Sequence, residues 1–246
     1  MVSIFFTIEF FFLKIWYTRF NQLNESEDIK MDILETMKAR HSVRQYKNQA
    51  IESSKREKIN ALIKDVNAES KLSIQVFYDE PKCFDSFMAH YGKFENVKNY
   101  IAIVGNKNDQ EKAGYYGEKI VLKCQKLGLN TCWVAMTHGK SKAQIKRGQK
   151  LLIIISLGYG ETQGVPHKSK SIAELGQADQ KNEWFEKGME AVSLAPTAVN
   201  QQKFYFELKN GIVTAKNLGG FYSRIDLGIA VSYTHLRAHE TRGNLV

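Results

Sequence analysis

Two arginines and a serine stand close together near the start of the chain, at Arg40, Ser42 and Arg44. Guanidinium groups form bidentate, charge-assisted hydrogen bonds with phosphate oxygens, and a serine hydroxyl can add a further bond. The cluster follows a helix predicted to begin at Asp32, so all three side chains stand at a helix end. The spacing favours binding of one phosphate group by all three side chains. A basic surface cluster without a ligand would have the same composition.

A second set of polar side chains follows a predicted helix that begins after Asn182. Pro196 ends this helix, because proline has no backbone N–H to donate and restricts the residue before it. The next residues, T-A-V-N-Q-Q, therefore form a short loop rich in amide and hydroxyl groups, before a strand predicted from Lys203. Neutral donors and acceptors on a rigid loop suit a planar heterocycle that has both kinds of edge, such as a flavin.

The glycines at 158 and 160 follow an apolar strand but do not make a dinucleotide-binding fingerprint. The third glycine, Gly164, comes one residue late, and V-P-H follows it where the fingerprint requires a helix. A basic loop, residues 167–170 with the sequence H-K-S-K, comes next.

Taken in chain order, these motifs resemble those of the FMN-dependent nitroreductases. The run A-P-T-A-V-N-Q-Q resembles their Ala-Pro-Ser/Thr-x-x-Asn-x-Gln loop, and R-H-S-V-R resembles their Arg-(Arg/His)-Ser-x-Arg motif. The stretch from Gly114 to Ala135 resembles their central helix and the strand after it, and the basic loop resembles one that reaches the FMN phosphate. The resemblance implies that FMN contacts Arg40, His41, Ser42, Arg44, either Lys168 or Lys170, Pro196, Thr197, Ala198, Asn200 and Gln202.

The order of the motifs differs from that of common nitroreductases, in which the Pro-Ser loop soon follows the arginine motif. Here Pro196 comes about 150 residues after Arg44. The chain therefore resembles nitroreductases in which two nitroreductase-like halves occupy one chain. Residues 31–176 would be the first half and residues 182–230 a second, truncated half. The protein is then expected to be a monomer that mimics a dimer, or a homodimer.

The resemblance implies an FMN-dependent oxidoreductase that passes hydride from NAD(P)H through FMN to a nitroaromatic, a quinone or a related small acceptor. No catalytic side chain is expected, because the flavin carries the chemistry. A flavin-binding protein without turnover is the first alternative, and a basic interaction module without flavin is the second.

The composition is that of an ordinary globular protein, with 246 residues, 43% hydrophobic residues and a net charge of +9. The lysines are scattered and do not form a basic stripe with exposed aromatics, so nucleic acid is not expected as a partner. The three cysteines form no C-x-x-C pair, which is typical of a reducing cytoplasm, where we expect the protein.

The resemblance implies an α+β fold of the nitroreductase kind, with a central mixed, mostly antiparallel sheet flanked by helices. Helices are predicted from Asp32, Ser54, Asp109, Asn182 and Phe221, a short basic helix at 141–150, strands at 72–78, 99–105, 131–135 and 151–157, and a hairpin around Asn210-Gly211. The aromatic stretch from Phe84 to Phe94 either lies over a pocket or covers the core, and we favour the second interpretation.

Both ends differ in character from the rest of the chain. Residues 1–30 are rich in Phe and Ile but are interrupted by charges, and we interpret them as translated upstream sequence, with a membrane anchor as the alternative. Residues 231–246 show no apolar period and resemble adaptor sequence, which predicts a shortened last helix. His235 and His239 are not expected to bind a metal.

Overall fold

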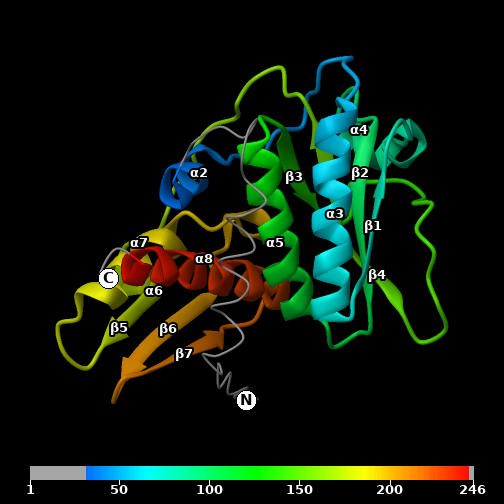
Figure 1. Ribbon diagram of the computed structural model, residues 1–246. Coiled ribbons are helices and arrows are strands. Elements are labelled where there is room, and N and C mark those ends of the chain that lie inside the picture. Colours follow the sequence, from blue (N-terminus) through cyan, green and yellow to red (C-terminus); the bar gives the residue numbers. More distant parts are fainter. Residues whose placement is uncertain (1–31, 244–246) are drawn as a thin grey trace.

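The computed structural model describes residues 32–243 of the chain (Figure 1). Its larger sheet is antiparallel, with strand order β1-β2-β4-β3. The strands are β1 (Ser73–Phe77), β2 (Asn99–Gly105), β3 (Asn130–Val134) and β4 (Lys150–Gly158). Every residue of β2 is buried, because this central strand is covered on both faces, as its continuous apolar sequence predicted.

The two faces of the larger sheet carry different layers. Ile101 and Ile103 of β2 pack with the helices α3 (Ser53–Ser70) and α5 (Gln110–Lys126), which lie across the sheet in Figure 1. Their neighbours Tyr100 and Ala102 point to the opposite face and pack with Phe84 and other residues of the β1–β2 connection. This connection contains the one-turn helix η1 (Pro81–Cys83) and the short helix α4 (Phe87–Tyr91).

A smaller sheet lies beside the first. Strand β5 (Gly176–Ala178) pairs in parallel with β6 (Phe204–Lys209), and β6 pairs in antiparallel with β7 (Ile212–Asn217). Phe204, Phe206 and Leu208 are buried, and they join one continuous core with α3 and α5. The remaining helices are α2 (Ile33–Ala39), α6 (Ile172–Leu175), α7 (Glu183–Ser193), η2 (Ala198–Asn200) and α8 (Ser223–Gly243). The predicted α+β class is confirmed.

Helices α5 and α8 cross at two glycines that occupy equivalent positions. A Cβ at Gly114 would lie 2.1 Å from the carbonyl oxygen of Ile225, three residues before Gly228. A Cβ at Gly228 would lie 2.0 Å from the carbonyl oxygen of Glu111, three residues before Gly114. The two backbones therefore touch in a reciprocal way, with residue n of α5 equivalent to residue n+114 of α8. Only glycine permits such a close approach.

Several local predictions are confirmed. Asp32 accepts a hydrogen bond from the backbone N–H of Glu35, and Asn182 accepts one from Phe185, so both cap their helices. Asn210 and Gly211 form the β6–β7 turn, and all three cysteines are free and buried.

The predicted basic helix at 141–150 is wrong. The backbone N–H of Lys142 donates to the Tyr100 hydroxyl at 3.0 Å, and that of Gln144 donates to the Gln75 side chain at 2.9 Å. These alternate bonds hold the segment in an extended form across the sheet face. Helix α3 begins at Ser53, one residue before its predicted start, and its N-cap, Glu52, makes no side-chain capping bond.

The predicted end of the last helix near residue 230 is likewise wrong. Helix α8 continues to Gly243, and Ile225, Ile229, Tyr233 and Leu236 repeat along its buried face. The apolar period is therefore present, carried by a tyrosine and a leucine among polar residues. Whether residues 231–246 derive from an adaptor stays a prediction.

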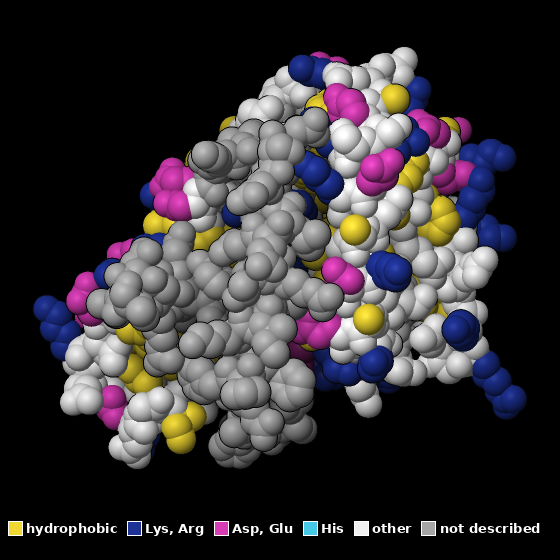
Figure 2. Space-filling view, in the orientation of Figure 1, with side chains coloured by type: hydrophobic (Ala, Val, Ile, Leu, Met, Phe, Trp, Pro, Cys, Tyr) yellow, Lys and Arg dark blue, Asp and Glu magenta, His cyan; other side chains and the backbone are white. Residues whose placement is uncertain are grey.

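Within residues 32–243 no helix is both long and apolar enough to cross a membrane. The predictions for residues 1–30 lie outside the described residues. On the face shown in Figure 2, Lys and Arg side chains are dispersed, with Asp and Glu among them.

Candidate functional site

Two of the predicted site segments are hydrogen-bonded to one another. The carbonyl oxygen of Lys168 accepts bonds from the side-chain amides of Asn200 and Gln202, both at 2.9 Å. In return, the Lys170 backbone N–H donates to Gln202 Oε1 at 2.8 Å, and Lys170 Nζ donates to the Gln202 carbonyl oxygen at 3.1 Å. The structure thus brings the basic loop and the Pro-Thr loop together, although they are about 30 residues apart in sequence.

A third predicted segment, from the arginine motif, lies against the same basic loop. A Cβ at Gly164 would come within 2.8 Å of His41 Cβ and 3.1 Å of the Ser42 carbonyl oxygen, and its φ of +73° also favours glycine. His41 and His167 are close enough to interact electrostatically. Burial lowers the pKa of both imidazoles, and the Arg40 charge lowers it further, so both are neutral at pH 7.

Beyond His41 the chain is extended, which spaces its side chains along a strip. Ser42 bridges Thr131 of β3, and the Glu95 backbone N–H donates to the Arg44 carbonyl oxygen at 3.0 Å. Ser42 and Arg44 are two residues apart, a separation of about 6.6 Å in extended chain, and the Ser42 hydroxyl is hydrogen-bonded to the buried Cys132 thiol. The exposed Arg44 guanidinium lies 6.0 Å from the ring centroid of Phe94. The strip therefore suits a ligand longer than a single phosphate.

Arg40 does not share this surface, contrary to the expected grip of three side chains on one phosphate. It is 3% exposed, its Nε donates to the Tyr233 hydroxyl at 3.1 Å, and it lies 3.8 Å from Glu118 Oε1. The reason is the end of α2 at Ala39, after which the backbone turns extended and Arg40 faces the core between α5 and α8.

Glu118 of α5 was missed in the sequence, where it is one of two carboxylates in a helix that also carries four lysines. It is fully buried and accepts hydrogen bonds from Trp133 Nε1 at 2.8 Å and from the Tyr233 hydroxyl at 3.1 Å. Burial raises the pKa of Glu118 to about 7, although Arg40 and the two donors oppose the shift. Glu118 thereby fixes the start of the arginine segment from within the core.

The Pro-Thr loop is held by a second carboxylate that sequence reasoning missed, Asp226 of α8. Its two oxygens accept from the Ala198 backbone N–H at 2.9 Å and from Gln201 Nε2 at 2.7 Å. Burial raises the pKa of Asp226 to about 6. Three residues of this loop have positive φ, namely Val199, Asn200 and Gln202, so the loop needs such support.

Within the Pro-Thr loop, only part of the predicted polar surface faces outward. Gln202 is 3% exposed, and both its amide oxygen and its amide nitrogen are bonded inside the protein. Thr197 Oγ1 accepts from the Gln202 backbone N–H at 3.1 Å, and Pro196 and Ala198 are half-buried. Asn200 and Val199 are exposed. Gln202 therefore positions the basic loop, and Asn200, although exposed, also uses both ends of its amide within the protein, donating to the Lys168 carbonyl oxygen and accepting from Gln202.

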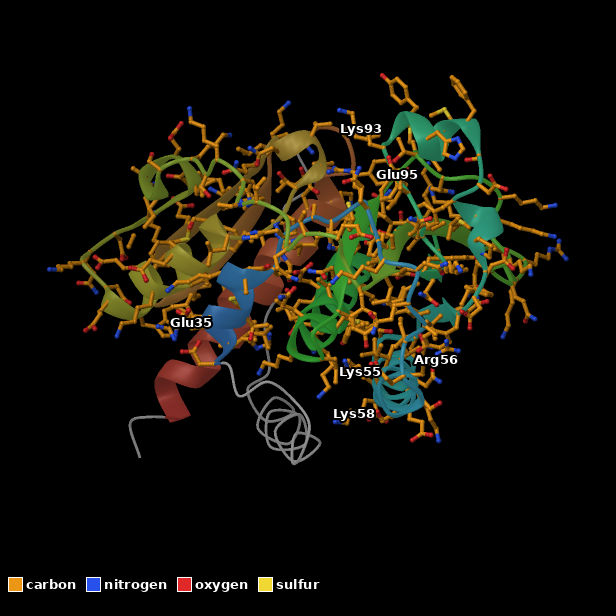
Figure 3. All side chains as sticks on the ribbon, turned by 90° about the horizontal axis from the view of Figure 1, so that it is seen from above. Glu35, Lys55, Arg56, Lys58, Lys93 and Glu95 are labelled. Atoms are coloured by element: carbon orange, nitrogen blue, oxygen red, sulfur yellow. The ribbon has the colours of Figure 1, made fainter. Side chains whose placement is uncertain are left out.

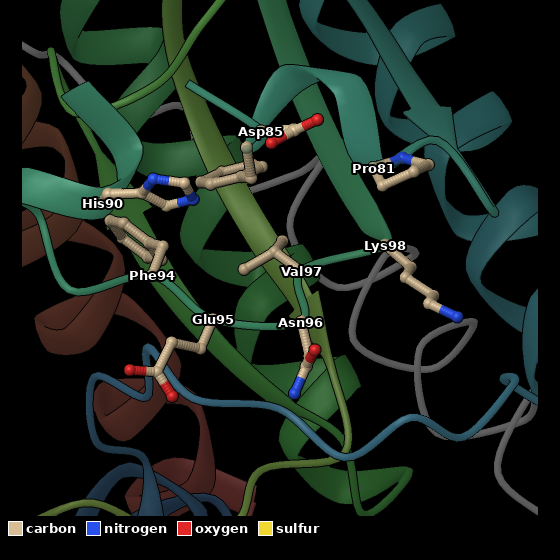
Figure 4. A pocket seen from close by; sticks show the side chains of 9 residues that line it. Pro81, Asp85, His90, Phe94, Glu95, Asn96, Val97 and Lys98 are labelled. Atoms are coloured by element: carbon tan, nitrogen blue, oxygen red, sulfur yellow. The ribbon is translucent and has the colours of Figure 1, made fainter. Parts of the chain in front are cut away.

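A pocket of about 400 Å³ adjoins the Arg44 end of the strip (Figure 4). Its residues come from the stretch between Pro81 and Lys98, so the aromatic segment both covers the core and lines a pocket. Seen from above in Figure 3, Lys93 and Glu95 lie beside α4.

Comparisons with known proteins agree with this fold. Residues 32–238 match the model of the family described as "Putative TM nitroreductase". A crystal structure titled as a "putative nitroreductase" from Thermotoga maritima is 24% identical and covers 88% of each chain, with a TM-score of 0.64. An FMN-dependent nitroreductase from Clostridium difficile is 22% identical and covers 57% of this chain and 92% of its own, with a TM-score of 0.42.

A nitroreductase structure in complex with FMN, from Desulfovibrio desulfuricans, is 15% identical and covers 59% of this chain and 95% of its own, with a TM-score of 0.47. No curated protein matches the chain.

Proposed function

The chain belongs to the TM nitroreductase family, whose model matches residues 32–238, and from this premise we propose that it is an FMN-dependent oxidoreductase. One observation carries the proposal. The arginine segment, the basic loop and the Pro-Thr loop meet at one place, held by the bonds between Lys168, Lys170, Asn200 and Gln202. The convergence of three motifs that are remote in sequence supports a ligand that they share.

The side chains at this junction fit FMN. Ser42 and the exposed Lys168 provide a hydroxyl and a cation at one end of the strip, where the phosphate would bind. Lys170 is a poorer candidate for the phosphate, because its Nζ already donates to the Gln202 carbonyl oxygen. Arg44 provides a guanidinium at the other end, for a polar edge of the ring system.

The Pro-Thr loop would face the flavin ring with Asn200 and with the backbone groups of residues 197–200. Pro196, Thr197 and Ala198 shape this loop, and Asp226 holds it through the Ala198 N–H. His41 would contribute through its backbone, since its half-buried ring interacts electrostatically with His167 of the basic loop.

FMN, when bound, supplies the hydride chemistry between NAD(P)H and a small acceptor such as a nitroaromatic or a quinone. The protein's own residues bind FMN and orient it. Arg44 and Lys168 balance the negative charge of the cofactor, Ser42 donates a hydrogen bond to it, and the amide-rich loop restricts the ring to one orientation.

We also propose that this one chain provides both halves of the site. The order helix–strand–strand–helix occurs twice, as α3-β1-β2-α5 and as α7-β6-β7-α8, and the reciprocal glycine contact relates the two final helices. The first unit, within residues 31–176, supplies the arginine segment and the basic loop. The second, which begins at residue 182, supplies the Pro-Thr loop. A monomer would then be sufficient for activity.

An absorption spectrum of the purified full chain, reconstituted with FMN, tests the proposal. Flavin bands that are bleached anaerobically by dithionite and by NADH or NADPH, and that return with a quinone or nitrofurazone, are expected. Bands that only dithionite bleaches would indicate a flavin carrier without turnover. A chain that stays colourless after reconstitution would refute the flavin function.

Arg44→Ala tests the strip itself. A charge-assisted hydrogen bond contributes about 1.5 to 3 kcal/mol, so FMN affinity should fall by roughly one to two decades. Arg147→Ala is the matched control, because Arg147 is an exposed arginine in the turn before β4. Equal FMN affinity of the two variants would remove Arg44 from the site.

A further inference from the structure

The pocket beside Arg44 belongs to none of the segments assigned above to the flavin. Its floor is apolar, because Phe84, Phe94 and Val97 are all buried. Around its mouth stand the exposed polar residues Asp85, His90 and Glu95, as Figure 4 shows. A volume of about 400 Å³ is at the small end of ligand pockets and suits a group of nucleoside size.

The pocket is continuous with the proposed flavin strip. Phe94, which lines it, carries the Arg44 guanidinium 6.0 Å above its ring. Glu95, which also lines it, exchanges backbone bonds with the strip on both sides, donating to Arg44 at 3.0 Å and accepting from Tyr46 at 3.1 Å. A molecule that reacts at the Arg44 end of the strip can therefore extend a second group into the pocket.

The charges around the pocket are mostly negative. The carboxylates of Asp85 and Glu95 make no hydrogen bond or ion pair with any part of the chain that the structure describes. Lys98 is the one cation among the lining residues, and its ammonium group donates to Asn48 Oδ1 at 2.6 Å. Free carboxylates accept hydrogen bonds from ribose hydroxyls and from the amino group of adenine, and they repel an added phosphate.

We infer that this pocket receives the adenosine group of the reducing coenzyme and selects NADH over NADPH. The aromatic floor would lie under the adenine ring, and Asp85 or Glu95 would accept from a ribose hydroxyl, as acidic residues do in other NAD sites. The 2′-phosphate of NADPH would meet two carboxylates, whereas the lining residues supply one cation, Lys98, whose ammonium group is directed to Asn48. The inference rests on the proposed function for the identity of the coenzyme.

Anaerobic reduction of the FMN-loaded full chain, followed at several concentrations of NADH and of NADPH, tests the selection. We expect the second-order rate constant of flavin reduction to be at least about tenfold higher with NADH than with NADPH. Repulsion between the 2′-phosphate and the nearby carboxylates supplies a factor of this size. The double variant Asp85→Arg/Glu95→Arg should reverse the preference. Asp65→Arg, a change at an exposed acid of α3, should leave it unaltered. A wild-type preference for NADPH, or a ratio that the double variant does not change, would overturn the inference.

Calorimetric titration with ADP-ribose and with its 2′-phosphorylated form separates this inference from the proposed function, because neither probe needs a flavin. ADP-ribose should bind at least about tenfold more tightly than the 2′-phosphate, and this difference should disappear in the double variant. A yellow, dithionite-reducible chain that binds neither probe would overturn the inference and leave the flavin function standing. A colourless chain that binds ADP-ribose selectively would support the pocket while refuting the flavin function.

Discussion

Helices α5 and α8, which cross at Gly114 and Gly228, each direct one buried carboxylate to a segment of the candidate site. Glu118 of α5 lies 3.8 Å from Arg40, at the start of the arginine segment. Asp226 of α8 accepts from the Ala198 N–H and from Gln201 in the Pro-Thr loop. The same helix pair therefore supports both sides of the site from the core.

The surroundings of the two carboxylates differ. Glu118 is fully buried and faces a guanidinium and two neutral donors, whereas Asp226 faces a backbone N–H and a side-chain amide. Burial nevertheless raises both pKa values by a similar amount, that of Glu118 to about 7 and that of Asp226 to about 6. Burial outweighs even a nearby cation at Glu118, so its importance lies in satisfying donors rather than in carrying charge.

The units that contain these helices also differ in their connections. The β1–β2 connection is long and forms the pocket, whereas β6 and β7 are joined by the tight Asn210-Gly211 turn. The α3–β1 connection is short, whereas the α7–β6 connection is the Pro-Thr loop. Each unit has thus elaborated a different connection, which forms the pocket in the first unit and the Pro-Thr loop in the second.

The largest effect is expected from Glu118→Leu. Trp133, Tyr233 and the Arg40 guanidinium would all lose a buried acceptor, and loss of one partner of a buried pair lowers the free energy of unfolding by about 3 to 5 kcal/mol. Urea unfolding at pH 7 measures this loss. Glu118→Gln, which keeps an acceptor oxygen in a site where the neutral form is already populated, should cost much less. Equal losses in the two variants would show that charge, not acceptor capacity, matters there.

Gly114→Ala and Gly228→Ala should each lower the free energy of unfolding by about 3 kcal/mol, the upper part of the range for overpacking. Each new Cβ would stand about 2 Å from a carbonyl oxygen of the opposite helix, so the helices must separate. The reciprocal geometry predicts similar losses for both variants, measured by thermal unfolding. A large loss in one variant only would contradict the equivalence of the two helices.

Asp226 should make stability depend on pH in the acid range. Its native pKa of about 6 exceeds the unfolded value of about 3.9, so the native state binds more protons between these values. The free energy of unfolding should therefore fall by about 2 kcal/mol as the pH rises from 4 to 6. Asp226→Asn should remove this component of the pH dependence. Glu118→Gln should instead reduce the pH dependence of the free energy of unfolding between about pH 4.5 and 7. Unfolding titrations over this range would refute the assignment if Asp226→Asn left the slope unchanged.

The smallest effect, and one of opposite sign, is expected from Gly188→Ala in α7. A Cβ there would meet only Thr234 Cγ2, at 4.0 Å, so nothing opposes the gain in helix propensity. The free energy of unfolding should rise by about 1 kcal/mol. Thermal unfolding of Gly188→Ala, measured alongside Gly114→Ala, gives the comparison. A loss of stability in Gly188→Ala would mean that α7 packs more tightly than the structure shows.

Local chemistry in the sequence determined the framework of this protein. The alternation of apolar and polar residues and the apolar runs located β1 to β4. Asp32 and Asn182 marked the starts of their helices, and Asn210-Gly211 marked the hairpin turn. Each of these signals acts within a few residues of chain. The motifs also indicated the family correctly, since their residue types and spacing are visible without a structure.

Only the tertiary structure decided how the site residues are used. Arg40 turns into the core because its buried partners Glu118 and Tyr233 lie there. The Gln202 side chain is hydrogen-bonded to Lys170 and Lys168 of another loop. The extended form of residues 141–146 and the length of α8 depend in the same way on partners far along the chain. Such contacts join residues that are tens to hundreds of positions apart, and no local pattern records which buried donor will meet which acceptor.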